Sequence, residues 1–289
     1  MLGHTLSCLR RLGFLLSIVL CWAAPAWAQA DTGSADNGAA VKEFVDLELV
    51  LAVDVSLSMD LDEQRLQRDG YVAALRDPNL LKAIKDGPNG RIAITYLEWA
   101  GSHMQSVVVP WRVISTAEEA NAFADTLAAY PISRAFFTSI SGAVDVAHRL
   151  FARSPVRGLR RVIDVSGDGP NNSGGPVELT RDKVVADGTV INGLAIQLAD
   201  RLGPYTYFDL PDLDRYYRDC VVGGPGAFVL SIRSKAEFAS AIRKKLLLEV
   251  AGRTLPVVRA QYSQKEEKYD CLIGEKMWQQ YQQNRGNWP

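Results

Sequence analysis

The sequence has few cysteines, few histidines and no excess of positive charge. Its 289 residues include 4 cysteines and 3 histidines, and the formal net charge is −1. A surface that binds nucleic acid needs an excess of lysine and arginine, so this balance argues against a nucleic-acid partner. Long apolar runs are also lacking, because the run from Leu12 to Trp22 is about half as long as a membrane span.

The first 28 residues have the pattern of a secretory signal peptide. Arg10 and Arg11 form a positive segment, the Leu12–Trp22 run follows it, and a small-x-small sequence ends at Ala28. We predict that residues 1–28 are removed on export. The mature chain would then lie in the periplasm or be secreted, without a membrane span. Cleavage removes two arginines and no acidic residue, so the mature net charge would be −3.

Cleavage would also leave Cys220 and Cys271 as the only cysteines. In an oxidising compartment two cysteines readily pair, here across a separation of 51 residues. On the chain-entropy model such a disulfide contributes roughly 3–4 kcal/mol, and it would tie the C-terminal tail to the body. Two unrelated thiols are the alternative, because sequence alone does not show how close the two residues lie.

Composition divides the mature chain into three parts. Residues 29–43 are rich in Ala, Gly, Asp, Ser and Asn, which predicts a flexible leader. Residues 44–250 alternate between strand-like and helix-like patterns and form the predicted domain. Residues 251–289 are polar, contain Trp278 and Tyr281, and are expected to pack on the domain as an extension.

The periodicity of the apolar residues predicts an α/β fold with a doubly wound, mostly parallel sheet and helices on both faces. One antiparallel feature is expected, an edge hairpin over residues 91–113. Ser234 is predicted to cap the last helix in a capping box with Glu237. The predicted strands are residues 45–53, 91–99, 105–113, 158–165, 189–198 and 226–232, and the predicted helices are residues 60–75, 116–129, 138–151, 176–186, 212–220 and 234–250.

Three loops at the expected carboxyl edge of this sheet are rich in oxygen-bearing side chains. Ligand sites in such folds form at this edge, so we expect the three loops to meet. Carboxylates and hydroxyls without His or Cys suit Mg²⁺, Mn²⁺ or Ca²⁺ rather than zinc. Because hydroxyls are neutral ligands, the cation would stay electropositive and could bind an acidic group of a protein partner. The side chains in these loops are Asp54, Ser56, Ser58 and Asp60, then Thr138 and Ser139, then Ser166, Asp168, Asn171 and Asn172.

These motifs resemble the von Willebrand factor A (vWA) domain with its metal-ion-dependent adhesion site (MIDAS). The Asp-x-Ser-x-Ser motif after a buried strand is matched by Asp54, Ser56 and Ser58. The family's loop threonine is matched by Thr138 in "FFTSISGAV", and its later aspartate by Asp168 in "VIDVSGDGPNN". The resemblance implies that Ser56, Ser58 and Thr138 contact the metal directly. It implies that Asp54 and Asp168 act directly or through water.

The resemblance covers residues 45–250, in which the order and spacing of the motifs agree. A closer resemblance is to an exported bacterial vWA-like family of unknown function (DUF1194-like), which shares "RRVIDVSGDG"-like and "LQRDGY"-like segments. One departure is Leu57, which stands where the vWA family often has glycine. Members of the vWA family are mostly adhesion and assembly modules without catalysis.

Each motif also has a purely structural interpretation. Ser58 or Asp60 could cap the helix that follows, and Asp60 is assigned to the cap rather than to the metal. Thr138 could cap its own helix. Asp164 lies inside an apolar strand and needs a partner, which we expect in the first loop. His148 falls in a helix and is interpreted as an ordinary histidine.

The sequence therefore predicts a non-enzymatic domain that binds a divalent cation and, through it, a carboxylate of a protein partner. One alternative is a metal-dependent hydrolase or phosphatase, with Ser56 or Ser58 as nucleophile or a metal-activated water. No histidine lies near these serines, and "DVSLS" is not a nucleophile elbow. The other alternative is a structural periplasmic protein whose metal site is vestigial.

Overall fold

A computed structural model describes residues 42–198, 208–252 and 268–286. The predicted signal peptide and the leader up to residue 41 lie outside the described residues, as does part of the C-terminal extension.

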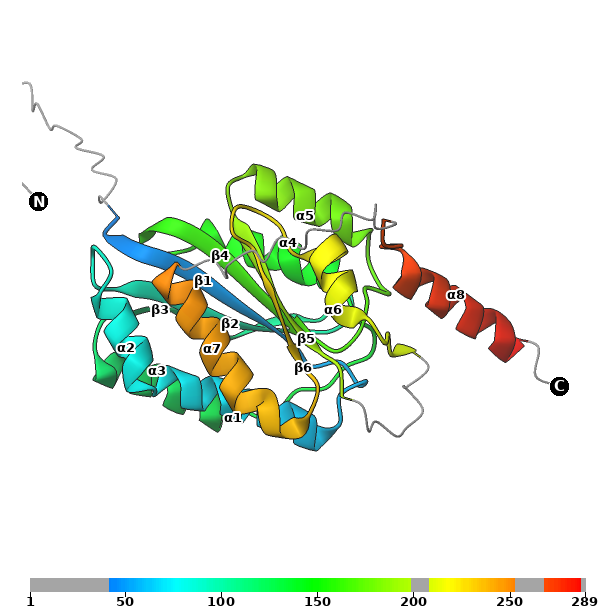
Figure 1. The fold of residues 1–289 in the computed structure, drawn as a ribbon, viewed down its shortest axis with the longest axis horizontal. Helices are drawn as coiled ribbons and strands as arrows, with labels where there is room; N and C mark the ends of the chain where they lie inside the picture. The colour runs from blue at the N-terminus through cyan, green and yellow to red at the C-terminus, as the bar shows by residue number, and fades with distance from the viewer. Residues whose placement is uncertain (1–41, 199–207, 253–267, 287–289) are drawn as a thin grey trace, which may run out of the picture. The chain divides into compact units, whose positions relative to one another are not determined.

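The domain is built on a six-stranded sheet with the order β3-β2-β1-β4-β5-β6 (Figure 1). Every neighbouring pair is parallel except β2 and β3, which form the antiparallel edge hairpin. The doubly wound, mostly parallel α/β fold predicted from the sequence is therefore confirmed. The strands are β1 Phe44–Asp54, β2 Ile92–Trp99, β3 Gln105–Ile114, β4 Arg157–Gly167, β5 Val190–Ile196 and β6 Val229–Ile232.

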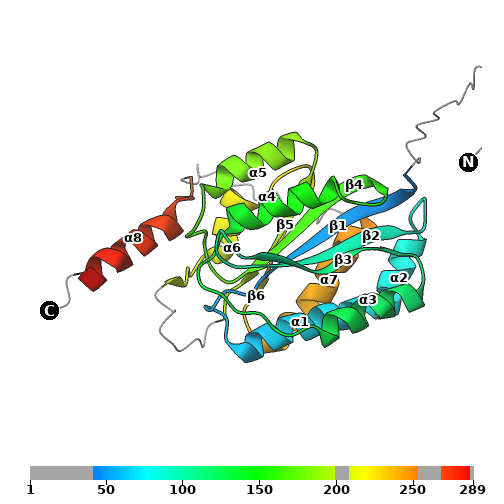
Figure 2. The ribbon, with the colours of Figure 1, turned by 180° about the vertical axis from the view of Figure 1, so that it is seen from behind.

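Helices cover both faces of the sheet, as Figures 1 and 2 show. The helices α1, α2, α3 and α7 pack on one face, and α4, α5 and α6 pack on the other. Sequence reasoning missed α2, whose Asp77 cap and first-position proline are good start signals. The helices are α1 Leu61–Leu75, α2 Pro78–Lys85, α3 Ala117–Ala129, α4 Ile140–Phe151, α5 Val177–Ala186, α6 Leu213–Tyr216, α7 Phe238–Ala251 and α8 Ile273–Gly286.

Strand β1 is central and apolar on both faces. Leu49 and Leu51 point into the core beneath α1 and α7, whereas Val50 and Ala52 point into the core beneath α4. All four side chains are fully buried. This two-sided burial explains the continuous apolar run in the sequence, which is typical of a parallel strand covered on both faces.

The helix starts confirm one predicted cap and correct two others. Asp60 caps α1 in a capping box with Glu63, so its role as a cap is confirmed. The capping role considered for Thr138 is wrong, because Ser139 caps α4 by accepting a hydrogen bond from the backbone of its third residue. The predicted capping box at Ser234 is also wrong. A short 3-10 turn precedes α7, and the Ser234 side chain makes no capping hydrogen bond.

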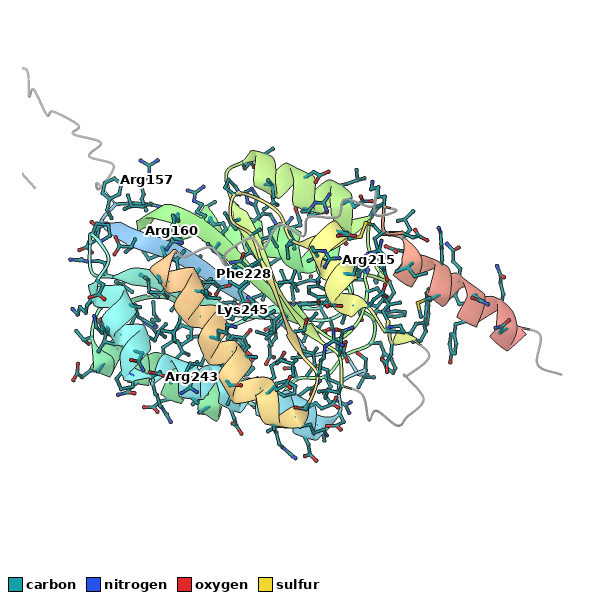
Figure 3. The ribbon with its side chains drawn as sticks, in the orientation of Figure 1. Arg157, Arg160, Arg215, Phe228, Arg243 and Lys245 are labelled. Carbon is teal, nitrogen blue, oxygen red and sulfur yellow. A yellow bond between two sulfur atoms is a disulfide. The ribbon has the colours of Figure 1, made fainter. Side chains whose placement is uncertain are left out.

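A buried ionic cluster joins α7 to the sheet. Lys245 of α7, labelled in Figure 3, forms ion pairs with Asp164 of β4 and with Glu249. All three side chains are buried. The Lys245 ammonium also lies 5.9 Å from the centre of the Phe228 ring. The partner of Asp164 therefore lies on α7, and the expectation that it lies in the first loop is wrong. The sequence gives no local signal for this pair, because the burial of Lys245 depends on tertiary packing.

The C-terminal extension is joined to the domain by a disulfide between Cys220 and Cys271, with Cα atoms 5.5 Å apart. The disulfide predicted from the sequence is thus confirmed. Beside it, the Tyr269 hydroxyl donates to Asp212 at 2.8 Å. Across the described residues, no helix has both the length and the apolar character needed to cross a bilayer.

Candidate metal centre

The candidate site lies where the two central strands end. Strand β1 pairs with β4 on one side and with β2 on the other, so the chain winds away in both directions from this point. Val53 lies opposite Ser166 in the register, which brings the loops after β1 and β4 together. A doubly wound sheet forms its ligand crevice at such a switch point, outside the carboxyl ends of the strands.

The first loop presents its oxygen atoms as a connected chain. The Ser56 backbone donates to Asp54 Oδ1 at 2.7 Å, which folds the turn back on the end of β1. The Ser56 and Ser58 hydroxyls lie 2.8 Å apart, and the Ser58 hydroxyl donates to Asp168 Oδ1 at 2.7 Å. Residues that are 110 positions apart in sequence therefore touch. The structure brings these predicted site residues together in one cluster.

Backbone hydrogen bonds join the loop before α4 to the loop after β1 and to the loop after β4. The Leu57 backbone donates to Ala135 O at 2.9 Å. The Thr138 backbone donates to Asn172 Oδ1 at 2.9 Å, and the Asn172 backbone donates to Thr138 O at 2.8 Å. Thr138 lines the same cavity as Ser56 and Asp168. Because Ser139 caps α4, the Thr138 hydroxyl is not needed as the helix cap.

Leu57 is accommodated in the first loop without unusual backbone geometry. Among the described residues, Phe137 is the one non-glycine residue with positive φ, at 69°, so Leu57 does not need the freedom of glycine. Leu57 is half-buried and lines the cavity beside the serines. The departure from the vWA pattern therefore changes the wall of the cavity and leaves the turn intact.

Asp54 carries a buried oxygen that lacks a partner. Asp54 Oδ2 is buried without a hydrogen bond, and a Cβ atom built on Gly167 would lie 2.9 Å from it and 2.7 Å from the Tyr217 hydroxyl. Burial raises the pKa of Asp54 well above its ordinary value. The charge of Asp168 raises the pKa further, and the hydrogen bonds from Ser56 oppose both effects. Glycine at position 167 leaves room for the carboxylate and the phenol to face the same point.

These features fit a divalent cation. Two carboxylates that repel each other, one unpartnered buried oxygen and a row of hydroxyls form an oxygen-only donor set. Such a set suits a hard cation, which would neutralise both charges. Within the described ranges, no group of three or more His, Cys, Asp or Glu side chains gathers as a metal cluster, so a cation at this site would need hydroxyl ligands.

The cavity above the site has a second wall made of aromatic rings. It has a volume of about 270 Å³, and its lining includes the polar residues Ser56, Ser58, Thr138 and Asp168. The aromatic residues in the lining are Phe136, Phe137, Phe208, Trp278 and Tyr281. Sequence reasoning missed this wall. Its signal in the sequence is the pair Trp278 and Tyr281, three positions apart in a polar segment that follows Cys271.

The family model described as "Protein of unknown function (DUF1194)" matches residues 44–254. The chain belongs to this family. No curated protein matches the sequence. The family match spans the whole sheet and α1 to α7, so it includes every predicted metal ligand and ends before α8.

Solved structures share the fold at low sequence identity. Proximal thread matrix protein 1 from the mussel byssus is 14% identical with a TM-score of 0.53, over 73% of this chain and 49% of that chain. A structure of the same protein with a zinc-occupied MIDAS motif is 14% identical with a TM-score of 0.50, over the same shares. The pilus adhesin SpaC from Lactobacillus rhamnosus GG is 13% identical with a TM-score of 0.51, over 73% of this chain and 31% of that chain.

This chain thus spans about half or less of the length of these proteins. At such identities the likeness establishes the fold, which is of the vWA type. Together with the family match, it confirms the resemblance expected from the sequence motifs.

Proposed function

We propose that this protein is an exported, non-enzymatic vWA-type domain that binds a divalent cation and, through it, a carboxylate of a protein partner. The metal ligands would be Asp54, Ser56, Ser58, Thr138 and Asp168, with Mg²⁺ as the expected ion and Mn²⁺ or Ca²⁺ as alternatives. The zinc-occupied MIDAS of the mussel protein supports a divalent cation in this fold. The disulfide supports an oxidising compartment, periplasmic or extracellular.

The observation that carries this proposal is the hydrogen-bonded chain from Ser56 through Ser58 to Asp168, with the unpartnered Asp54 oxygen behind it. Asp54 and Asp168 are buried carboxylates that repel each other, and a cation between them would relieve that repulsion. Thr138, from the loop before α4, lines the same cavity. A cation here would be held by these hydroxyls and carboxylates and would supply a positive charge that can bind a carboxylate of a partner.

The test uses Mn²⁺, whose free ion gives a spin-resonance signal that disappears on binding. We expect the purified mature chain to bind one Mn²⁺, Mg²⁺ to compete for the site, and Asp54→Ala to abolish binding. A second step adds acetate or a blocked peptide with one Asp to the loaded protein. Binding of the carboxylate that persists in chelator, or in Asp54→Ala, would overturn the proposal.

The hydrolase alternative has little support in the structure. Neither His103 nor His148 lines the cavity, and His148 instead faces Asp187 at 3.0 Å. The Ser58 hydroxyl donates a hydrogen bond to the Asp168 carboxylate. A nucleophilic serine also needs a general base held in place by a third residue, and the described residues that line the cavity include no such pair. Metal-dependent turnover of esterase or phosphatase substrates by the wild type, lost in Asp54→Ala, would revive the alternative.

A further inference from the structure

We propose that the aromatic wall contributed by helix α8 makes the site selective for a carboxylate that is flanked by an aromatic side chain. The occupant would be a protein segment with Asp or Glu on the metal and a Phe, Tyr or Trp against the rings of Phe137, Trp278 and Tyr281. This inference rests on the proposed function, because the carboxylate needs the metal. It goes further by assigning a binding role to the C-terminal extension.

The rings form one packed cluster rather than scattered surface residues. Trp278 and Tyr281 stack with centroids 5.6 Å apart, and Phe208 contacts both, at 5.8 and 5.5 Å. Phe137 meets Trp278 edge to face at 5.0 Å, which joins the loop before α4 to α8. Trp278 and Tyr281 are three positions apart and so share one face of the helix. The lining of the same cavity therefore includes both oxygens and ring surface.

Several bonds hold α8 against the loop that carries Asp168. The disulfide at Cys271 fixes the chain just before the helix. In the first turn, Glu275 accepts a hydrogen bond from Asn171 Nδ2 at 2.7 Å. Gly274 lies so close to Asn171 that an added Cβ would come within 2.1 Å of the Asn171 carbonyl oxygen. This arrangement places the ring cluster beside the metal site in a defined position.

Phe137 has a strained backbone that supports a role in binding. Its φ of 69° is unfavourable for a bulky side chain and costs on the order of 1–3 kcal/mol. The conformation is held by the Gly101 backbone, which donates to Phe136 O at 3.1 Å, and by Thr138, which is anchored to Asn172. The ring stays 43% exposed at the cavity, so burial in the core does not account for it.

The size and polarity of the cavity indicate the occupant. A volume of about 270 Å³ is enough for one carboxylate and one neighbouring ring. The rings offer an apolar surface, and aromatic pairs stabilise contacts beyond the area they bury. A cationic side chain over the same rings is the competing chemistry, since aromatic faces also attract cations.

The experiment measures the affinity of the Mn²⁺-loaded mature chain for blocked peptides that carry a single carboxylate. The peptides are N-acetyl-Gly-Asp-X-Gly-amide with X as Phe, Ala or Lys, plus an Asn analogue of the Phe peptide. We expect the Phe peptide to bind about tenfold or more tightly than the Ala peptide, as burial of one ring predicts. The Asn analogue should not bind.

Two substitutions in α8 test the contribution of the aromatic rings to peptide selectivity separately from metal binding. In Trp278→Ala and Tyr281→Ala, the preference for Phe over Ala should fall to within about twofold, with Mn²⁺ affinity unchanged. Gln279→Ala, on the exposed side of the same helix, is the matched control and should keep the preference.

The outcomes distinguish the two proposals. Equal, metal-dependent binding of the Phe and Ala peptides, or tighter binding of the Lys peptide, would overturn the aromatic selectivity alone. If Trp278→Ala keeps the tenfold preference, the wall is not the source of it and the inference is wrong. If no peptide binds, or if binding survives chelation, the proposed function itself fails.

Discussion

Substituting Asp54 with Asn should stabilise the metal-free protein and remove its response to metal. In the metal-free chain the substitution keeps the oxygen that accepts from the Ser56 backbone. It replaces the unpartnered oxygen by an uncharged amide next to the Tyr217 hydroxyl. It also removes the repulsion by Asp168 that raises the pKa of Asp54. Relief of an unpartnered buried charge is worth about 1–3 kcal/mol, so the free energy of unfolding should rise by that order.

Metal should offset most or all of this difference in stability between the two proteins. A ligand at 100 times its dissociation constant stabilises the folded state by about 2.7 kcal/mol. The wild type should gain this increment from Mg²⁺, whereas Asp54→Asn should gain almost none. Urea denaturation in chelator and in saturating Mg²⁺ measures both quantities for each protein.

The matched control is Asp62→Asn, because Asp62 is an exposed acid in the first turn of α1, with 74% of its side chain accessible. It should leave the Mg²⁺ increment unchanged and lower the stability in chelator by less than about 1 kcal/mol, because it removes only an exposed ion pair with Arg65 and a favourable charge at a helix start. The reasoning is refuted if Asp54→Asn is less stable than the wild type in chelator, or if it gains the same Mg²⁺ increment.

Three further predictions concern the fold around the site. Replacing Cys220 and Cys271 by Ser should lower the free energy of unfolding by about 4 kcal/mol, because the disulfide closes a loop with a sequence separation of 51 residues. Urea titrations measure this loss, and a loss below about 1 kcal/mol would contradict the chain-entropy model. Burial raises the pKa of Glu249 to about 7, so the folded state holds this proton more tightly than the unfolded state. Stability should therefore fall as pH rises from about 4.5 to about 7, and Glu249→Gln should flatten that slope in denaturation at several pH values; an unchanged slope would contradict the assignment. Phe137→Gly should be about 1 kcal/mol more stable than Phe137→Ala, because only glycine relieves the positive φ after the ring is gone, and equal thermal stabilities would show that the backbone is unstrained.

Local sequence patterns were enough to predict the sheet and the first half of the site. Strand β1 is buried on both faces, so its sequence is a continuous apolar run that can be recognised without knowing the fold. The alternation of strands and helices is visible in the same way, from the local pattern of apolar residues. Asp54, Ser56 and Ser58 could be placed at a carboxyl edge, because parallel strands end together. The capping box of Asp60 also left a local signal.

The remaining features depend on contacts between distant segments. Lys245 was not expected to pair with Asp164, because a lysine in an amphipathic helix normally reaches solvent. No local sequence signal places the aromatic wall at the cavity, because Trp278 lies 110 residues beyond Asp168 and α8 reaches the cavity through tertiary contacts, which include the disulfide and the Asn171–Glu275 hydrogen bond. The strained Phe137 left no pattern in the sequence, since its conformation is imposed by hydrogen bonds from Gly101 and Asn172.

Metal binding at this site is tested most directly by a crystal structure of the mature protein grown or soaked in Mn²⁺, with anomalous diffraction recorded to locate the ion. We expect one strong anomalous peak at the carboxyl ends of β1 and β4, about 2.0–2.2 Å from the hydroxyl oxygens of Ser56, Ser58 and Thr138. Asp54 and Asp168 would contact the same peak directly or through water. Crystals with millimolar Mn²⁺ and no anomalous peak at these serines would contradict the central claim.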